Sequence, residues 1–295
     1  MKKILFVMSA LGIFLSFDAC RVSETAQQEG SSSLLWKISG DNLPGVSYVY
    51  GTIHIQDKRI FSYGENVRNA FKNANQVAVE VLLDEINPAS AMQLMLMKDS
   101  TLDMLMSDTE YQRLAENYQK VTGADISTAA TMKPFFLSAN LIQAIAPGDM
   151  PVPLDLHFIQ KAREQNKTVI GLETLEEQIA IIDGISYSTQ AEMLLESLED
   201  VDELKQQFNK LVDAYLSMDK DAIVKLTDDP TIPAGFMDEL LNKRNKIMVE
   251  RMEKAIQHAE TFTAVGAAHL YGKDGIVSML KDRGYTVEAV PVTFN

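Results

Sequence analysis

The chain has 295 residues, of which 46% are hydrophobic and 23% are charged, a composition that argues against extensive disorder and allows a substantial core. Its net charge of −14 argues against nucleic acid as a partner, because phosphate binding needs clustered Lys and Arg. The single cysteine excludes an internal disulfide.

The first twenty residues have the pattern of an export signal. Lys2 and Lys3 precede an uncharged apolar run over residues 4–17, which is short for a membrane-spanning helix. Cys20 follows this run, which resembles a lipoprotein signal whose cysteine becomes the lipidated N-terminus. A secretory peptide cut nearby, with Cys20 incidental, is the alternative.

These features divide the chain into three parts. Residues 1–19 are predicted to be a signal peptide, and residues 20–33 a lipid-anchor cysteine with a flexible polar tether. Residues 34–295 are predicted to form the folded domain. The protein is therefore expected to be exported and then anchored to the cell envelope through Cys20, or to be periplasmic or secreted.

The folded part begins with strand patterns. Two short β-favouring runs, at residues 34–38 and 46–50, flank a turn-forming DNLPG segment and predict an antiparallel hairpin that ends at Gly51. Residues 62–73 have a helical pattern. Residues 76–83 (QVAVEVLL) are so uniformly apolar that they predict a buried strand with Glu80 inside it.

The middle of the chain is mostly helical in pattern. Residues 88–143 are rich in Met and Leu, which is typical of core packing, although such a segment also suits a groove for flexible peptides. A loop, a helix over 155–165 and a strand over 168–172 follow. Helical patterns then fill residues 175–259, with an interruption near 229–233 and a long amphipathic helix over 239–258.

The C-terminal part returns to strand patterns. Residues 261–265 and 286–291 are predicted strands, and residues 274–283 between them are a predicted helix that Gly284 ends. We therefore expect one α/β domain, with a mixed β-sheet formed by N- and C-terminal strands and a large helical insertion.

Two of the four histidines lie in Gly-x-x-His turns, Gly51–His54 and Gly266–His269, and chance predicts roughly 0.2 such pairs. Each turn follows a β-type run, and a glycine at a strand's end lets the backbone turn sharply. Open α/β sheets place ligand sites at the carboxyl ends of strands. Two such turns on neighbouring strands would bring two imidazoles together, which suits a metal site.

A metal site also needs a carboxylate, and three acids are candidates. Glu80 leads because it interrupts an apolar run, where a Glu is costly unless it is paired or metal-bound; a solvated Glu at the sheet's edge is the alternative. Glu173 follows the 168–172 strand, or else caps the next helix. Asp155, at a helix start, is the weakest because Asp there is usually an N-cap.

The remaining polar residues give weaker signals. Arg244 on the long predicted helix either pairs with one of these acids or a substrate carboxylate, or lies on a solvated face. His157 and His258 lie on helical patterns and are interpreted as surface or packing residues. Walker, Gly-x-Ser-x-Gly and His-Glu-x-x-His motifs do not occur in the sequence.

The sequence resembles the TraB/GumN family, which includes the Tiki-type metalloproteases. The matching segments are YVYGTIH (48–54), the ANQVAVE run that ends at Glu80, NKTVIGLETLEEQ around Glu173, the Arg244–Asn245 pair, and TAVGAAHLYGKDGIVSMLKDRGYTV. Together they cover about residues 34–290. The resemblance implies an α/β fold, two Gly-x-x-His motifs, an essential acid that matches Glu80, and, from the Tiki-type members, metal-dependent peptide hydrolysis.

The resulting hypothesis is a metal-dependent hydrolase that acts on a peptide or protein substrate. His54 and His269, with Glu80 or Glu173, would hold a divalent ion; resemblance implies Mn²⁺ or Co²⁺, and the residue types equally allow Zn²⁺. Glu80 would act as general base, and Arg244 or Asn245 would stabilise the developing oxyanion or orient an acid. One alternative is a non-catalytic protein that binds metal or haem on the same fold, and another is a degenerate scaffold whose surface serves partner contacts.

Overall fold

The computed structural model describes residues 32–225 and 235–295. The predicted signal peptide, Cys20 and most of the tether lie outside these residues, as does the predicted interruption near 229–233. Within the described residues, no helix is both long and apolar enough to cross a membrane.

A six-stranded mixed sheet, counted over the described residues, is the centre of the fold. Its spatial order is β4-β3-β5-β2-β1-β6. The central pairs β4·β3, β3·β5 and β5·β2 are parallel, whereas β2·β1 and β1·β6 are antiparallel. The strands are β1 (Leu35–Ser39), β2 (Ser47–Thr52), β3 (Gln76–Val79), β4 (Thr168–Gly171), β5 (Thr261–Gly266) and β6 (Thr286–Val290).

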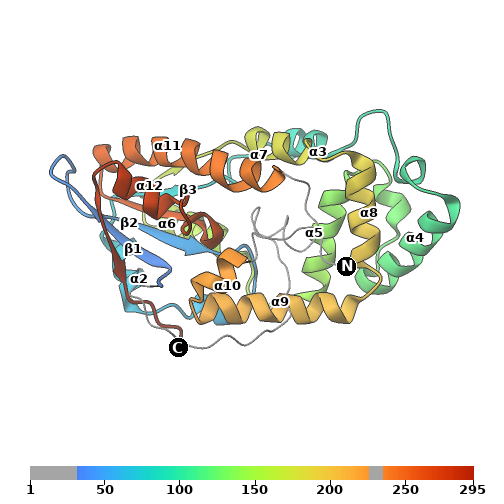
Figure 1. Cartoon of the computed structure of the whole chain (residues 1–295), viewed down its shortest axis with the longest axis horizontal. Helices are drawn as coiled ribbons and strands as arrows, with labels where there is room; N and C mark the ends of the chain where they lie inside the picture. The colour runs from blue at the N-terminus through green and yellow to red at the C-terminus, as the bar shows by residue number, and fades with distance from the viewer. Residues whose placement is uncertain (1–31, 226–234) are drawn as a thin grey trace.

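Helices cover both faces of this sheet, because alternate strand residues point to opposite sides. Val49, Ala78 and Val265 pack on one face with α11 (Arg244–His258) and α12 (Ile276–Asp282). The opposite face, which includes Tyr50 and Phe262, packs against α2 (Glu65–Asn73) and α6 (Leu154–Glu164). The sheet is therefore the middle of three layers, as Figure 1 shows.

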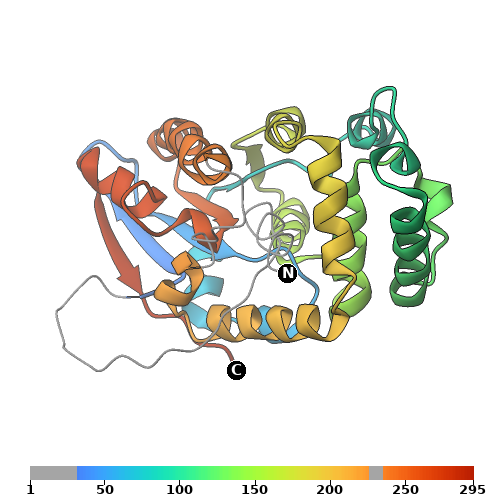
Figure 2. The same cartoon turned by 45° about the vertical axis from the view of Figure 1, so that its right-hand side comes forward.

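The remaining helices form a lobe beside the sheet, to the right in Figures 1 and 2. The lobe arises from the long connections β3–β4 and β4–β5, and α9 (Val201–Leu216) runs from it back beneath the sheet. Its helices are α3 (Pro88–Met95), α4 (Asp108–Thr122), α5 (Pro134–Ile145), α7 (Leu175–Ile182) and α8 (Tyr187–Ser197), with the short turns η2 (Leu102–Leu105) and η3 (Ile126–Ala129). The short turn η1 (Lys58–Phe61) lies between β2 and α2, and α10 (Lys220–Lys225) follows α9 beside the sheet.

The predicted α/β class, mixed sheet and helical insertion are confirmed, with two local corrections. The strand expected over residues 76–83 ends at Val79, so Glu80 lies just beyond the strand instead of inside it. The helix expected over 239–258 begins as a π-helical turn, η4 (Asp238–Lys243), and becomes α-helical at Arg244. A π-helical turn inside a helix is frequent at functional sites.

Candidate active site

The parallel strands β2, β5, β3 and β4 bring their carboxyl ends to one edge of the sheet. His54, Glu80 and Glu173 come within two residues of the ends of β2, β3 and β4. His269 closes η5 (Ala267–His269), the turn that directly follows β5. The two Gly-x-x-His turns are direct neighbours, because Gly51 pairs with Val265 and Thr52 with Gly266. Four of the residues predicted from sequence therefore gather at one sheet edge.

Close packing surrounds both turn glycines and is tighter at Gly51 than at Gly266. A Cβ on Gly51 would lie 2.7 Å from Leu270 Cδ1 and 3.0 Å from Ala267 Cα, atoms of the other turn. A Cβ on Gly266 would lie 3.3 Å from Glu80 Oε1. Gly266 has φ −52° and ψ 136°, which any residue adopts, so the sharp-turn reason predicted for it is wrong. Its role is to let a carboxylate approach.

Glu80 is the residue that joins the strands at this edge. Its Oε1 accepts a hydrogen bond from the Gly266 backbone N–H at 2.6 Å. Its Oε2 accepts from Arg244 Nη2 at 2.7 Å and from Gln178 Nε2 at 3.2 Å. The side chain is 21% exposed and lines a pocket, so the carboxylate is held by three donors and still faces open space.

Arg244 is buried, which excludes the solvated helix face as its position. Its Nε and Nη2 donate to both carboxylate oxygens of Glu173 at 2.7–3.1 Å, and Nη2 also reaches Glu80. Burial acts to lower the pKa of Arg244, but Glu80 and Glu173 outweigh it and raise that pKa above its ordinary value. One guanidinium thus ties together two predicted acids that are 93 residues apart in sequence.

His269 is fully buried and is oriented by Asn245. The Nδ1 of His269 lies 2.7 Å from Asn245 Oδ1, and Asn245 Nδ2 donates to the carbonyl of Asp274 at 2.8 Å. Since the Asn245 amide nitrogen is used by Asp274, its oxygen accepts from the imidazole, which places the proton on Nδ1. The other ring nitrogen, Nε2, lies 3.9 Å from Glu80 Oε1.

His54 is oriented in a similar way by Asp155, in the first turn of α6. Nδ1 of His54 lies 2.7 Å from Asp155 Oδ2, and the His54 side chain is 39% exposed. Desolvation acts to lower the pKa of His54, but the charges of Asp155 and Glu80 raise it above its ordinary value. Burial likewise acts to raise the pKa of Asp155, and His54 lowers it. Asp155 is therefore a partner of His54, whereas its sequence suggested an N-cap.

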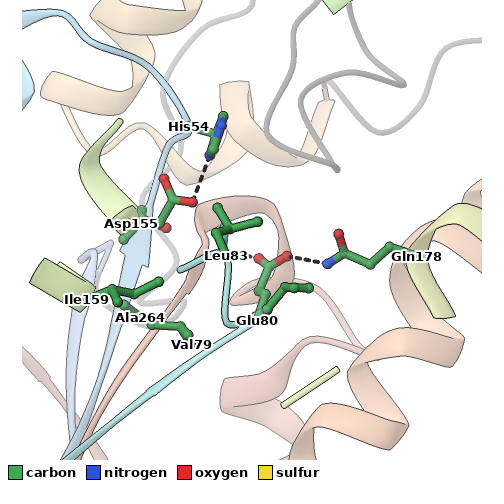
Figure 3. Close-up of a pocket in the computed structure, with 11 residues that line it drawn as sticks. His54, Val79, Glu80, Leu83, Asp155, Ile159, Gln178 and Ala264 are labelled. Carbon is green, nitrogen blue, oxygen red and sulfur yellow. Dashed lines mark hydrogen bonds and ion pairs between the residues drawn. The ribbon is translucent and has the colours of Figure 1, made fainter. Parts of the chain in front are cut away.

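His54, Asp155, Glu80 and Gln178 line a pocket of about 180 Å³. Figure 3 shows the His54–Asp155 pair and the Glu80–Gln178 pair around it, with Val79, Ile159 and Ala264 as apolar wall residues. Glu173 and His269 do not line it. Such a cavity, in which several polar groups converge beside apolar wall residues, is typical of a site for a small ligand or a reacting group.

The donor types at this site fit a divalent cation. Imidazole and carboxylate are the ligands of Zn²⁺ and related ions, and a ligating histidine usually donates its other ring N–H to a carboxylate or carbonyl oxygen. His54 and His269 both have Nδ1 engaged in that way, by Asp155 and Asn245. Among the described residues, no three His, Cys, Asp or Glu side chains lie close enough to hold one ion, so binding requires them to converge.

Three contacts at the site were not predicted from the sequence. Gln178 on α7 donates to Glu80 and to Glu173, at 3.2 and 3.3 Å. Tyr215 on α9 donates from its hydroxyl to the Gly51 carbonyl at 2.7 Å, which anchors the first turn. Gln178 lies within the recognised ETLEEQ segment, but neither it nor Tyr215 interrupts an apolar pattern. His157 and His258 lie away from the pocket lining, and His157 contacts the Tyr63 hydroxyl.

Comparison with known proteins gives this arrangement a context. Metalloprotease TIKI2 of Danio rerio is 24% identical over 90% of this chain, and metalloprotease TIKI1 of Xenopus tropicalis is 24% identical over 97%. The chain spans 62% and 67% of the lengths of these two relatives. Protein YbaP of Escherichia coli (strain K12) is 24% identical over 83% of this chain and 92% of its own length.

No solved structure matches the chain. Residues 34–289 match the TraB/PrgY/gumN family, and this match takes in both Gly-x-x-His turns, Glu80, Glu173 and the Arg244–Asn245 pair. The chain belongs to the TraB/PrgY/gumN family.

Proposed function

We propose that this protein is a metal-dependent peptidase whose active site lies at the sheet edge around Glu80. The observation that carries the proposal is the orientation of two imidazoles by Asp155 and Asn245 beside a pocket-facing carboxylate. The relatives named metalloproteases support peptide bonds as the target.

His54 and His269 would ligate the cation through Nε2, with Glu80 as the third protein ligand or its neighbour. Nε2 of His269 already faces Glu80 Oε1 at 3.9 Å, so a small movement brings both within coordinating distance. Glu173 was a predicted ligand too, but both its oxygens accept from Arg244. We therefore assign Glu173 to holding Arg244. A Mn²⁺, Co²⁺ or Zn²⁺ ion suits these ligands.

The chemistry follows from the polar groups that face the pocket. Together with a divalent cation held by these residues, water would be activated and the scissile carbonyl polarised. Glu80 Oε1 accepts one hydrogen bond, from Gly266. As the neighbour of the ion and not its ligand, Oε1 keeps a further lone pair that would take the proton of the attacking water. Arg244 and Gln178 hold Oε2 and so fix the direction of Oε1. Asn245 acts through His269, as a positioning residue.

Export is part of the same proposal and rests on the sequence of residues 1–33. Replacement of Cys20 by Ser is expected to abolish incorporation of labelled fatty acid and to release the protein from membranes. If the Cys20→Ser variant is labelled and membrane-bound like the wild type, the anchor is elsewhere.

The peptidase activity is tested with the full chain and a library of quenched fluorescent peptides. After treatment with a chelator, addition of Mn²⁺, Co²⁺ or Zn²⁺ is expected to restore cleavage. Glu80→Gln is expected to lower kcat/KM by at least about 100-fold, in line with loss of a general acid–base group. The matched control is Glu116→Gln, at an exposed position on α4.

Two results would contradict the proposal. One is cleavage that survives both the chelator and Glu80→Gln, which would point to a contaminating protease. The other is stoichiometric binding of metal or haem with no cleavage of any peptide, which would favour a binding protein on the same fold.

A further inference from the structure

A second pocket adjoins the pocket of the proposed active site, because the two share His54 as a lining residue. It has a volume of about 180 Å³ and is bordered by the segment after β2, by one face of α5 and by the proline-containing loop that follows α5. His54 lines both pockets. A substrate chain that passes the proposed catalytic groups would therefore also pass the mouth of this second pocket.

The floor of the second pocket is apolar and its rim carries amides. Ile55 and Ile142 are buried and form the floor. The rim carries the side-chain amides of Gln56, Asn140 and Gln143, and amides both donate to and accept from peptide groups. Among the described residues that line it, none is Asp, Glu, Lys or Arg, although the chain has a net charge of −14.

Small residues on α5 are what make the second pocket open. Ala139, Ile142 and Gln143 on α5, and Ala146 at its C-cap, follow the spacing of one helical face, and they line this pocket together with the segment after β2. Because Ala139 and Ala146 have short side chains, they leave space between this face and the segment after β2. A larger residue at position 146 would occupy this space.

The walls of the second pocket are held in place. Pro147 and Pro153 have fixed φ angles, and the backbone N–H of Met150, between them, donates to the carbonyl of Gln56 at 2.9 Å. Asn140 Nδ2 donates to the Tyr118 hydroxyl at 3.2 Å. The pocket is therefore largely formed before a ligand arrives, which is usual for binding sites in proteins.

We infer that this pocket is the subsite for one large, uncharged apolar side chain of the peptide, such as Leu, Met or Phe, next to the cleaved bond. This inference rests on the proposed peptidase function. The volume equals about six water molecules at ~30 Å³ each, enough for a Leu-sized side chain. A charged side chain is disfavoured because the lining offers no counter-charge apart from His54.

The test is a series of quenched fluorescent peptides that differ at one position, with Gly, Leu, Phe, Lys or Glu there, scanned on both sides of the cleaved bond. At one position, Leu or Phe is expected to raise kcat/KM over Gly by about 10- to 100-fold, as is usual for a hydrophobic pocket. Lys and Glu are expected to give no gain. Equal kcat/KM for all five residues at every position would overturn the inference.

The variant Ala146→Trp fills the pocket and is expected to reduce the Leu-to-Gly ratio of kcat/KM to below about 3-fold. The matched control is Ala144→Trp, at an exposed position on the same helix outside this pocket, for which the ratio is expected to be unchanged. An unchanged ratio in Ala146→Trp would overturn the inference. Ala139→Leu tests the same space if Ala146→Trp does not fold.

Binding measurements separate this inference from the peptidase proposal. If no peptide is cleaved with any metal, the peptidase proposal fails, and fluorescence anisotropy then reports binding of the same labelled peptides. Tighter binding of the Leu peptide by the wild type, lost in Ala146→Trp, supports an apolar peptide subsite. Equal binding of the Leu and Gly peptides by the wild type overturns it.

Discussion

Gly51 shows at the level of one residue why the two Gly-x-x-His turns depend on each other. Any side chain at position 51 would collide with Ala267 and Leu270 of the other turn. We expect Gly51→Ala to lower the free energy of unfolding by about 1–3 kcal/mol, the usual cost of overpacking, and to weaken metal binding as well. Urea unfolding and equilibrium dialysis measure the two effects.

The control for this substitution is Gly148→Ala, since a Cβ at position 148 meets no atom within 4 Å. Gly148→Ala is expected to leave both the free energy of unfolding and the affinity for metal unchanged. If Gly51→Ala is as harmless as Gly148→Ala, the turns do not touch as described.

Arg244 provides a second test at the residue level. Lys would keep the charge but lose the planar fork that binds Glu173 through two nitrogens and also reaches Glu80. We expect Arg244→Lys to cost about 3 kcal/mol in free energy of unfolding, because the two acids lose donors in a buried position. The comparison is Arg251→Lys on the same helix, whose pair with Glu177 is more than a third exposed, with an expected cost below about 1 kcal/mol. If Arg244→Lys and Arg251→Lys lowered the free energy of unfolding equally, the buried role of Arg244 would be contradicted.

The sequence predicted His54, His269, Glu80, Glu173, Arg244 and Asn245 as site residues, and gave a pair of Arg244 with one of the acids as one of the alternatives. Glu80 was detectable because a carboxylate interrupts an apolar run, and the histidines because the motif repeats. The pairing of His54 with Asp155 joins positions 101 residues apart, and no local pattern encodes it. Asp155 was ranked lowest since an Asp at a helix start has a common local explanation.

At the level of elements, the N-terminus of α7 determines where Gln178 points. Thr174 and Glu177 form a capping box, and Glu177 also receives two hydrogen bonds from Arg251. The hydrogen bonds from Arg251 are the main reason that the pKa of Glu177 falls to about 2. Because this pKa is lower in the folded protein than the ordinary value of 4.5, ionised Glu177 stabilises the fold at pH values above 4.5. This contribution is lost as the pH falls toward 2.

We therefore expect Glu177→Gln to lower the free energy of unfolding by about 1 kcal/mol at pH 7, the typical value of a helix cap with an exposed ion pair. The difference from wild type is expected to narrow between pH 4.5 and pH 2, as the wild-type carboxylate takes up a proton. Urea unfolding of both proteins at a series of pH values measures this difference in the free energy of unfolding. A difference that stays constant down to the lowest pH would mean that the charge of Glu177 contributes nothing.

The elements themselves were largely predictable, because the period of apolar residues determines most helices and strands. The hairpin of β1 and β2 follows from its turn residues. The end of β3 at Val79 and the π-helical turn before Arg244 were not predictable. The end of β3 directly precedes Glu80, and the π-helical turn directly precedes Arg244. These two residues hydrogen-bond to each other, so tertiary hydrogen bonds there override the local pattern.

At the level of the whole molecule, the sheet gathers residues from positions 54 to 269 at one edge, and the helical lobe adds walls beside it. The parallel order β4-β3-β5-β2 is what makes this possible, since it aligns four carboxyl ends. The lobe contributes Gln178 from α7 and the second pocket from α5. The site is therefore a product of the topology of the entire domain.

The central claim is that the two Gly-x-x-His turns hold a single metal ion. Equilibrium dialysis of the full chain against Mn²⁺ or Co²⁺ tests it most directly, with His54→Gln, His269→Gln and, as control, the exposed His258→Gln. Wild type and control are expected to bind one ion per chain, and each of the other two variants to bind it more than about 100-fold more weakly, beyond the loss usual for partners of ligands. The claim would be contradicted if the wild type bound two ions and each histidine variant lost the binding of a different one. It would also be contradicted if a folded His54→Gln or His269→Gln variant bound one ion as tightly as the wild type.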